Sequence, residues 1–257
     1  MNDDLRSLTK FDVGRVLERT FGTLRQNLVV FFLLSVLLVG VPDALINAGN
    51  FGFGFNQGLG FNVPVFGRGL PGVLLSVVGA ATLQAALSHG TIMALNGRKA
   101  DFGGCLGTGA RHFLAVLGIC ILSVLGVGVG LLMLVIPGIF LMICWMVAVP
   151  VQVVERAGVI QSMSRSWNLT EFHRGMLLIL LILYIVFMIV VGMLTEGLSS
   201  SLGAMGATGR SLEALVISPL VSSATAMITA TGVAAVYFEL RMIKEGLVPE
   251  ELVSVFD

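Results

Sequence analysis

The sequence predicts an all-α integral membrane protein with six transmembrane helices in three hairpins, each preceded by a short amphipathic interfacial helix. Hydrophobic residues make up 56% of the 257 residues and charged residues only 12%, and the mean hydropathy is +0.97. A typical soluble domain carries about 25% charged residues. The apolar runs are continuous and do not alternate with polar residues, which is unlike transmembrane β-strands.

We expect residues 1–257 to form a single polytopic membrane domain. A hydrocarbon core about 30 Å thick needs roughly 20 apolar residues per helix, which predicts spans near residues 28–46, 70–95, 113–131, 137–155, 175–195 and 213–239. No residue between 113 and 154 is charged, so spans three and four must be joined by a very tight turn. Two sets of residues could form this turn: Gly126, Gly128 and Gly130, or Pro137 and Gly138.

Three shorter segments, near residues 11–25, 101–112 and 158–171, each precede a span. In the first, one face of the predicted helix carries Val13, Val16, Leu17, Thr20, Phe21 and Leu24. In the third, a similar stripe consists of Val159, Ile160, Met163, Trp167 and Thr170. An apolar stripe opposite charged and polar residues is typical of a helix that lies flat on a membrane. The second segment has the same spacing but holds four glycines between residues 103 and 109.

The basic residues predict how the chain is threaded. With six spans, 13 of the 15 Lys and Arg residues fall on the side that carries both termini, and only Arg68 and Arg210 fall on the other. Lys and Arg accumulate in cytosolic loops of membrane proteins. We therefore expect a protein of the plasma (cytoplasmic) membrane, the inner membrane of a bacterial-type cell, with cytosolic N- and C-termini. The outer connections are expected at residues 43–69 and 196–210, and no feature indicates a nucleic-acid partner.

Two stretches resemble a known family. Residues 131–170, "LLMLVIPGIFLMICWMVAVPVQVVERAGVIQSMSRSWNLT", and residues 234–247, "AAVYFELRMIKEGL", are similar to the glycerophosphoryl diester phosphodiesterase membrane-domain family. The matching features include the Pro-Gly pair at 137–138, residues 150–155, and Arg165-Ser166 with Leu169. In some relatives this domain is joined to a soluble phosphodiesterase barrel. Membrane segments and short flanks use all 257 residues, so the resemblance implies a stand-alone member that lacks the catalytic barrel.

No catalytic, cofactor or metal motif is found in the sequence. The three histidines do not have the HExxH spacing of a zinc protease, and no GxSxG nucleophile elbow is present. Cys105, Cys120 and Cys144 lack the CxxC spacing of a zinc or redox site. We therefore expect a protein that is not an enzyme and that has no cofactor.

Two groups of polar residues are the candidate functional residues. The first is a candidate structural network at the cytosolic ends of spans four and six: Glu155, Arg165, Glu239 and Arg241. On a helical wheel Arg165 lies opposite the apolar stripe of its segment, so it would face the cytosol unless another segment covers it. The second group is a candidate intramembrane polar cluster in span two: Gln84, Ser88 and His89. Such residues either bond to a neighbouring helix or line a proton or substrate path.

These observations favour a scaffold or accessory factor that interacts with membrane lipids, with a partner membrane protein or with further copies of itself. The alternative is a transporter or permease for a small molecule or lipid, which would need a polar cavity near mid-membrane. An intramembrane enzyme would need two polar residues on facing spans, such as His89 and Ser222, within hydrogen-bond reach.

Overall fold

The computed structural model describes residues 11–49 and 69–245, and within these two ranges the chain is helical, with short turns and no strand. Six helical stretches are long and apolar enough to cross a membrane: Val13–Asn47, Leu74–Leu95, Phe102–Met133, Val135–Glu155, Arg174–Gly203 and Glu213–Glu245. Each predicted span overlaps one of these stretches. The prediction of an all-helical protein with six helices of membrane-spanning length is confirmed.

The first stretch consists of helix α2 (Val13–Ser35), a π-helical turn η1 (Val36–Gly40) and helix α3 (Val41–Gly49). The Asp12 carboxylate caps α2 by accepting a hydrogen bond from the Gly14 amide at 2.7 Å. The helix is kinked at Asn27, which has φ −122° and ψ 24°. This side chain is held on both sides, since its amide donates to the Thr23 carbonyl and its oxygen accepts from the Ala100 amide, both at 3.3 Å.

The outer connection that was predicted from residue 43 begins later, because Asp43 lies within α3 and is buried. The Ser222 hydroxyl donates a hydrogen bond to Asp43 Oδ2 at 3.2 Å. A carboxylate that accepts such a bond can remain inside a helix bundle. The rest of the connection, residues 50–68, lies outside the described residues.

Helix α5 (Gly69–Leu95) and helix α6 (Phe102–Met133) pack against one another over a long contact. The sequence predicted a break between an interfacial helix and a span near residue 112, but α6 is continuous there. Glycines bring its first half against α5: a Cβ atom on Gly109 would lie 2.8 Å from the Thr82 carbonyl oxygen, and one on Gly90 would lie 2.9 Å from Cys105 Sγ. The glycine-rich segment is therefore a close-packing helix face.

Helix α6 ends in a one-residue turn at Leu134, which has the extended values φ −166° and ψ 147°. Neither predicted set of turn residues forms this turn. Gly126 and Gly130 lie within α6 and contact the returning helix α7 (Val135–Trp145), where a Cβ atom on Gly130 would lie 3.0 Å from Gly138 Cα. The glycines are needed for close approach of the two helices and not for a left-handed turn. The fourth stretch is interrupted at Met146 and Val147 before helix α8 (Ala148–Glu155) begins, and Pro150 lies in the first turn of α8.

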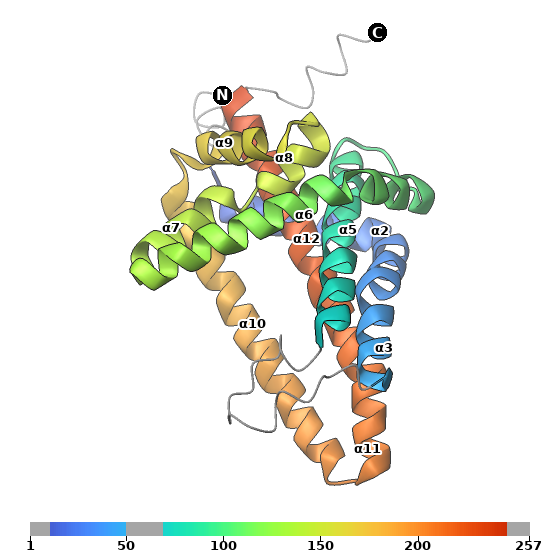
Figure 1. Cartoon of the computed structure of the whole chain (residues 1–257). Helices are drawn as coiled ribbons and strands as arrows, with labels where there is room; N and C mark the ends of the chain where they lie inside the picture. The colour runs from blue at the N-terminus through green and yellow to red at the C-terminus, as the bar shows by residue number, and fades with distance from the viewer. Residues whose placement is uncertain (1–10, 50–68, 246–257) are drawn as a thin grey trace.

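The remaining elements are α9 (Val159–Thr170), α10 (Arg174–Gly203), α11 (Ala207–Leu212), the π-helical turn η3 (Glu213–Ile217) and α12 (Ser218–Glu245). Pro219 is the second residue of α12 and lies in its first turn, where its missing N–H is tolerated. Helix α12 is central, since it packs against α2, η1 and α5. Figure 1 shows α10 standing apart from α5 over much of its length, and its buried apolar residues, Leu177 and Leu181, lie near its first turns.

Candidate functional site

Glu239 of α12 is held between two arginines of α2. Its side chain is 3% exposed, and Arg15 Nη2 lies 2.9 Å from Oε1 while Arg19 Nη1 contacts Oε2. The Arg19 guanidinium also stacks over the Phe238 ring at 5.2 Å. Two cations on one nearly buried carboxylate offset the cost of removing it from water. This contact joins the first described helix to the last.

Glu155, at the end of α8, is the centre of a second group of contacts. The structure brings it together with Arg165, whose Nε lies 3.3 Å from Glu155 Oε2. The Tyr237 hydroxyl donates to Glu155 Oε1 at 3.0 Å. Arg165 also pairs with Glu245 Oε1, and Arg241 Nε reaches Glu245 Oε2 at 2.7 Å. The four predicted network residues therefore fall into two groups, with Arg241 connected to Glu155 only through Glu245 and Arg165.

Sequence reasoning did not name Arg15, Arg19, Tyr237 or Glu245 as members of these groups. One signal was available for the arginines, because residues 15 and 19 are four apart and share a face of the predicted helix. Their partner could not be read from the sequence, since Glu239 follows Arg19 by 220 residues. Only the packing of α2 on α12 brings the three together.

Helix α9 is covered by protein on part of its predicted lipid stripe. Met163 and Thr170 are buried, whereas Ile160 is 71% exposed. The Ser166 hydroxyl donates to the Cys144 carbonyl oxygen at 2.7 Å, which fixes the helix on the end of α7. Lys244 of α12 donates to the Asn168 carbonyl oxygen at 2.6 Å. The end of α12 thus covers α9 on the side that carries Arg165.

His173, in the turn between α9 and α10, lies beside this region. Its ring is 5.9 Å from the ring of the buried Phe11. Burial, together with the nearby Lys244 ammonium, lowers the pKa of His173 from its ordinary value of 6.5. The neutral imidazole is therefore the form that suits the folded protein.

The predicted intramembrane cluster on α5 does not form one site. Ser88 is fully buried, and its hydroxyl has no hydrogen-bond partner within the described ranges. The Nδ1 atom of His89 is also buried and has no hydrogen-bond partner among the described residues. Gln84 instead lines a groove on another side of α5. The three side chains therefore have different surroundings, although they are close in sequence.

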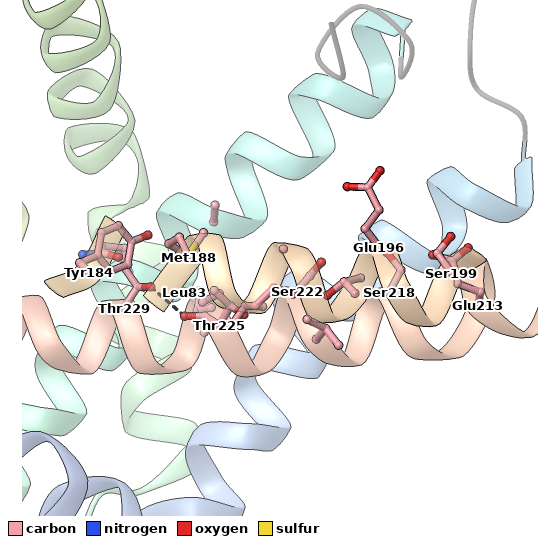
Figure 2. Close-up of a pocket in the computed structure, with 17 residues that line it drawn as sticks. Leu83, Tyr184, Met188, Glu196, Ser199, Glu213, Ser218, Ser222, Thr225 and Thr229 are labelled. Atoms are coloured by element: carbon pink, nitrogen blue, oxygen red, sulfur yellow. Dashed lines mark hydrogen bonds between the residues drawn. The ribbon is translucent and has the colours of Figure 1, made fainter. Parts of the chain in front are cut away.

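Several polar side chains line the groove that contains Gln84. It lies between α10, α5 and α12, with a volume of about 750 Å³. Figure 2 shows the side chains of α10 and α12 that line it, and hydroxyl-bearing residues follow one face of α12: Ser218, Ser222, Thr225 and Thr229. Tyr184 and Thr195 of α10 lie on the other wall, and Glu196 and Glu213 lie at one end. Apolar atoms still provide most of the lining.

The candidate side chains for catalysis and for metal binding do not come together in the described residues. An intramembrane enzyme would need a pairing such as His89 with Ser222. The Ser222 hydroxyl instead donates its hydrogen bond to Asp43. In residues 11–49 and 69–245, no three His, Cys, Asp or Glu side chains are grouped so that they could hold a metal ion. Cys105, Cys120 and Cys144 are free thiols.

The sequence matches no protein-family model, no curated protein and no solved structure. The resemblance to the glycerophosphoryl diester phosphodiesterase membrane domain therefore stays a prediction.

Proposed function

We propose that the protein is a non-enzymatic scaffold or accessory factor of the plasma membrane, and that the groove between α10, α5 and α12 holds a membrane partner. The partner is a lipid, a transmembrane segment of another protein, or a second copy of this chain. The proposed topology has three helical hairpins and both termini in the cytosol, with amphipathic segments at the cytosolic surface. The predicted excess of basic residues on that side supports this orientation.

The groove is the observation that carries the proposal. Helix α10 is long and apolar, yet it buries few side chains against the rest of the chain. Polar residues that face lipid are costly, and they usually mark an interaction inside the membrane. Gln84 lies on the groove wall, and its amide forms no hydrogen bond with any other described residue. A partner that fills the groove would supply packing for α10 and hydrogen bonds for these side chains.

We also propose that the chain is a relative of the glycerophosphoryl diester phosphodiesterase membrane-domain family. The supporting observation is that Glu155 contacts both Arg165 and Tyr237, so residues of the two resembling stretches meet at one carboxylate. Residues that carry such a contact resist substitution, because removing one leaves the others without a partner.

A second candidate function is transport of a lipid or another small molecule. The row of hydroxyls from Ser218 to Thr229 favours it, because the row continues along α12. A polar headgroup could contact one hydroxyl after another along this row. Scrambling of a labelled lipid by the reconstituted protein would distinguish this function from a scaffold.

The proposal is tested by affinity isolation of the full chain in mild detergent, with lipids and co-purifying proteins identified by mass spectrometry. Thr225→Phe places a bulky ring in the groove, and we expect it to lose the partner that the unmodified protein retains. Ile185→Phe is the matched control, because Ile185 is exposed on α10 and does not line the groove. If the unmodified protein retains neither a lipid nor another protein and is monomeric in detergent, the proposal is wrong. Equal retention by both variants would place the partner elsewhere.

A further inference from the structure

The hairpin formed by α6 and α7 has an unusually apolar tip. No side chain from residue 124 to residue 151 carries a hydroxyl, an amide or a charge. At the tip, Leu132 is 89% exposed, Met133 77% and Ile136 80%. A turn that emerges into water normally carries polar residues. This tip instead presents only apolar side chains to its surroundings.

Two features of the turn reduce the number of backbone groups that need water. It deviates from helical geometry at Leu134, whose amide donates to the Gly130 carbonyl oxygen at 3.0 Å. Pro137, in the first turn of α7, has no N–H to satisfy. A hydrocarbon environment tolerates a helix reversal only when unpaired backbone groups are kept to a minimum.

The depth of the tip follows from contacts of Phe140 in α7. Its ring packs edge-on against Trp167 of α9, and the Arg174 guanidinium lies 4.6 Å from its centre. Arg174 begins α10 and is a residue type that remains near the membrane surface. Leu134 is six residues from Phe140, which corresponds to about 9 Å along an α-helix. The tip is therefore at most this much deeper than Phe140, even if α7 runs along the membrane normal. The tip therefore cannot reach the far side of a core about 30 Å thick.

The orientation of the hairpin agrees with this limit. Figure 1 shows α6 and α7 running across the long axes of α5, α10 and α12, near the end of the molecule where α9 and the last turns of α12 lie. Helix α7 has 11 residues, which gives a length of about 16 Å. The chain then turns into α8, whose residues are mostly buried in the protein.

An apolar groove flanks the hairpin on the side of α9. It has a volume of about 700 Å³ and is lined mainly by Leu122, Leu125, Val129, Trp145, Ile160 and Trp167. The Arg174 guanidinium lies 5.0 Å from the centre of the Trp167 ring beside it. An apolar slot beside an Arg and a Trp has the chemistry of the boundary between acyl chains and headgroups.

We infer that the α6–α7 hairpin is a half-membrane anchor, which enters the leaflet on the side of α9 and returns to that side, with its tip among lipid acyl chains. The occupant of the exposed hairpin surface is lipid. Four helical stretches then cross the membrane: Val13–Asn47, Leu74–Leu95, Arg174–Gly203 and Glu213–Glu245. The hairpin adds cross-section to one leaflet only. An even number of crossings is kept, so both termini stay on one side.

The test uses single cysteines in the full chain after Cys105, Cys120 and Cys144 are replaced by Ala. Met133→Cys reports on the tip, Lys99→Cys on the side of α9, and Ala204→Cys on the opposite side. Each is exposed to a membrane-impermeant maleimide in sealed vesicles of both orientations. We expect Lys99→Cys and Ala204→Cys to be labelled from opposite sides of the membrane. Met133→Cys should not be labelled from either side. Thermal unfolding of the cysteine-free protein checks that it is folded, and Leu132→Cys replaces Met133→Cys if that variant is unstable.

A nitroxide attached at Met133→Cys then measures depth and surroundings. We expect frequent collisions with oxygen, rare collisions with a water-soluble nickel chelate, and a depth in the half of the bilayer next to residue 99. Maleimide labelling of Met133→Cys from the side of Ala204→Cys would overturn the inference, because the hairpin would then cross. Labelling from the side of Lys99→Cys would place the tip in water and also overturn it. Rare collisions with both reagents would show a protein partner instead of lipid.

Discussion

Gly109 of α6 packs directly against the backbone of Thr82 in α5: a Cβ atom at residue 109 would lie 2.8 Å from the Thr82 carbonyl oxygen. The same atom would lie 3.1 Å from the Ala86 Cβ atom. Both helices are otherwise long and regular, so the contact can only open by separating them. The first half of α6 is therefore placed by the absence of a side chain at this position.

Gly109→Ala is expected to destabilise the protein by about 1–3 kcal/mol, the usual cost of an extra methyl group in a tight contact. Gly107→Ala is the matched control in the same helix, because nothing lies within 4 Å of a Cβ atom there. Alanine favours a helix interior over glycine by up to about 1 kcal/mol, so the control should be neutral or stabilising. Thermal unfolding in mild detergent measures both. Equal effects would mean that α5 and α6 are not in close contact at residue 109.

The second prediction concerns Glu239, whose carboxylate contacts Arg15 and Arg19. Glu239→Gln removes the charge that both guanidinium groups neutralise, and breaking a buried pair on one side typically costs about 3–5 kcal/mol. Glu18→Gln makes the same chemical change on an exposed position of α2 and should have little effect. The two variants are compared by thermal unfolding. A loss at Glu239→Gln no larger than that at Glu18→Gln would show that the carboxylate is solvated.

The third prediction concerns pH. The pKa of His173 is lowered by burial and by Lys244, so the folded state binds the proton less tightly than the unfolded chain. Stability is then fully present above the ordinary value of 6.5 and decreases as the pH falls below it. His173→Asn cannot titrate, so between about pH 7.5 and pH 5.5 it should lose less thermal stability than the unmodified protein. Parallel losses in the two proteins would assign the pH dependence to other groups.

The fourth prediction is the orientation of the chain, derived from the division of basic residues. Reporter fusions after Lys99 and Asp257 should be active in the cytosol, and fusions after Gly60 and Gly203 should be active outside it. A half-membrane hairpin and a crossing hairpin give the same result at these four positions. Cytosolic activity after Gly60, or external activity after Asp257, would contradict the proposed topology.

The sequence predicts well what depends on local pattern. Apolar run length is enough to place the six long helices, because a membrane-spanning helix satisfies its own backbone. The turn at Leu134 was missed for a physical reason: glycines suggested chain reversal, but two closely packed helices need them equally. Asp43 was placed at the start of the outer connection, although the predicted first span reached residue 46. The Ser222 hydroxyl that helps to hold it inside the bundle is distant in sequence.

The candidate site shows the same limit. A helical wheel gives the face of α9 on which Arg165 lies, but not what covers that face. The last turns of α12 cover it, through Glu245 and Lys244, and this depends on how α12 packs as a whole. The groove beside Gln84 was likewise not predictable, since it results from the position of α10 relative to α12.

The fifth prediction concerns the pair formed by Glu155 and Arg165. Their side chains are 23% and 32% exposed, and the charged atoms are 3.3 Å apart. An exposed ion pair contributes under about 1 kcal/mol to stability, whereas breaking a buried pair costs considerably more. This pair is partly covered, so we expect a coupling energy of about 1 kcal/mol between the two side chains. The Tyr237 hydroxyl adds to the effect of changing Glu155, because it donates to the same carboxylate.

Thermal stability in detergent is measured for Glu155→Gln, Arg165→Gln and the double variant. We expect the double variant to lose less than the sum of the two single losses, because the second change removes a partner that is already missing. Arg156→Gln is the matched control for loss of a nearby positive charge, since Arg156 is exposed at the end of α8. Its effect should add to that of Glu155→Gln without coupling. Two small, additive losses for Glu155 and Arg165 would mean that both charges are solvated markers of the membrane boundary, and that α8, α9 and α12 are held together by apolar packing alone.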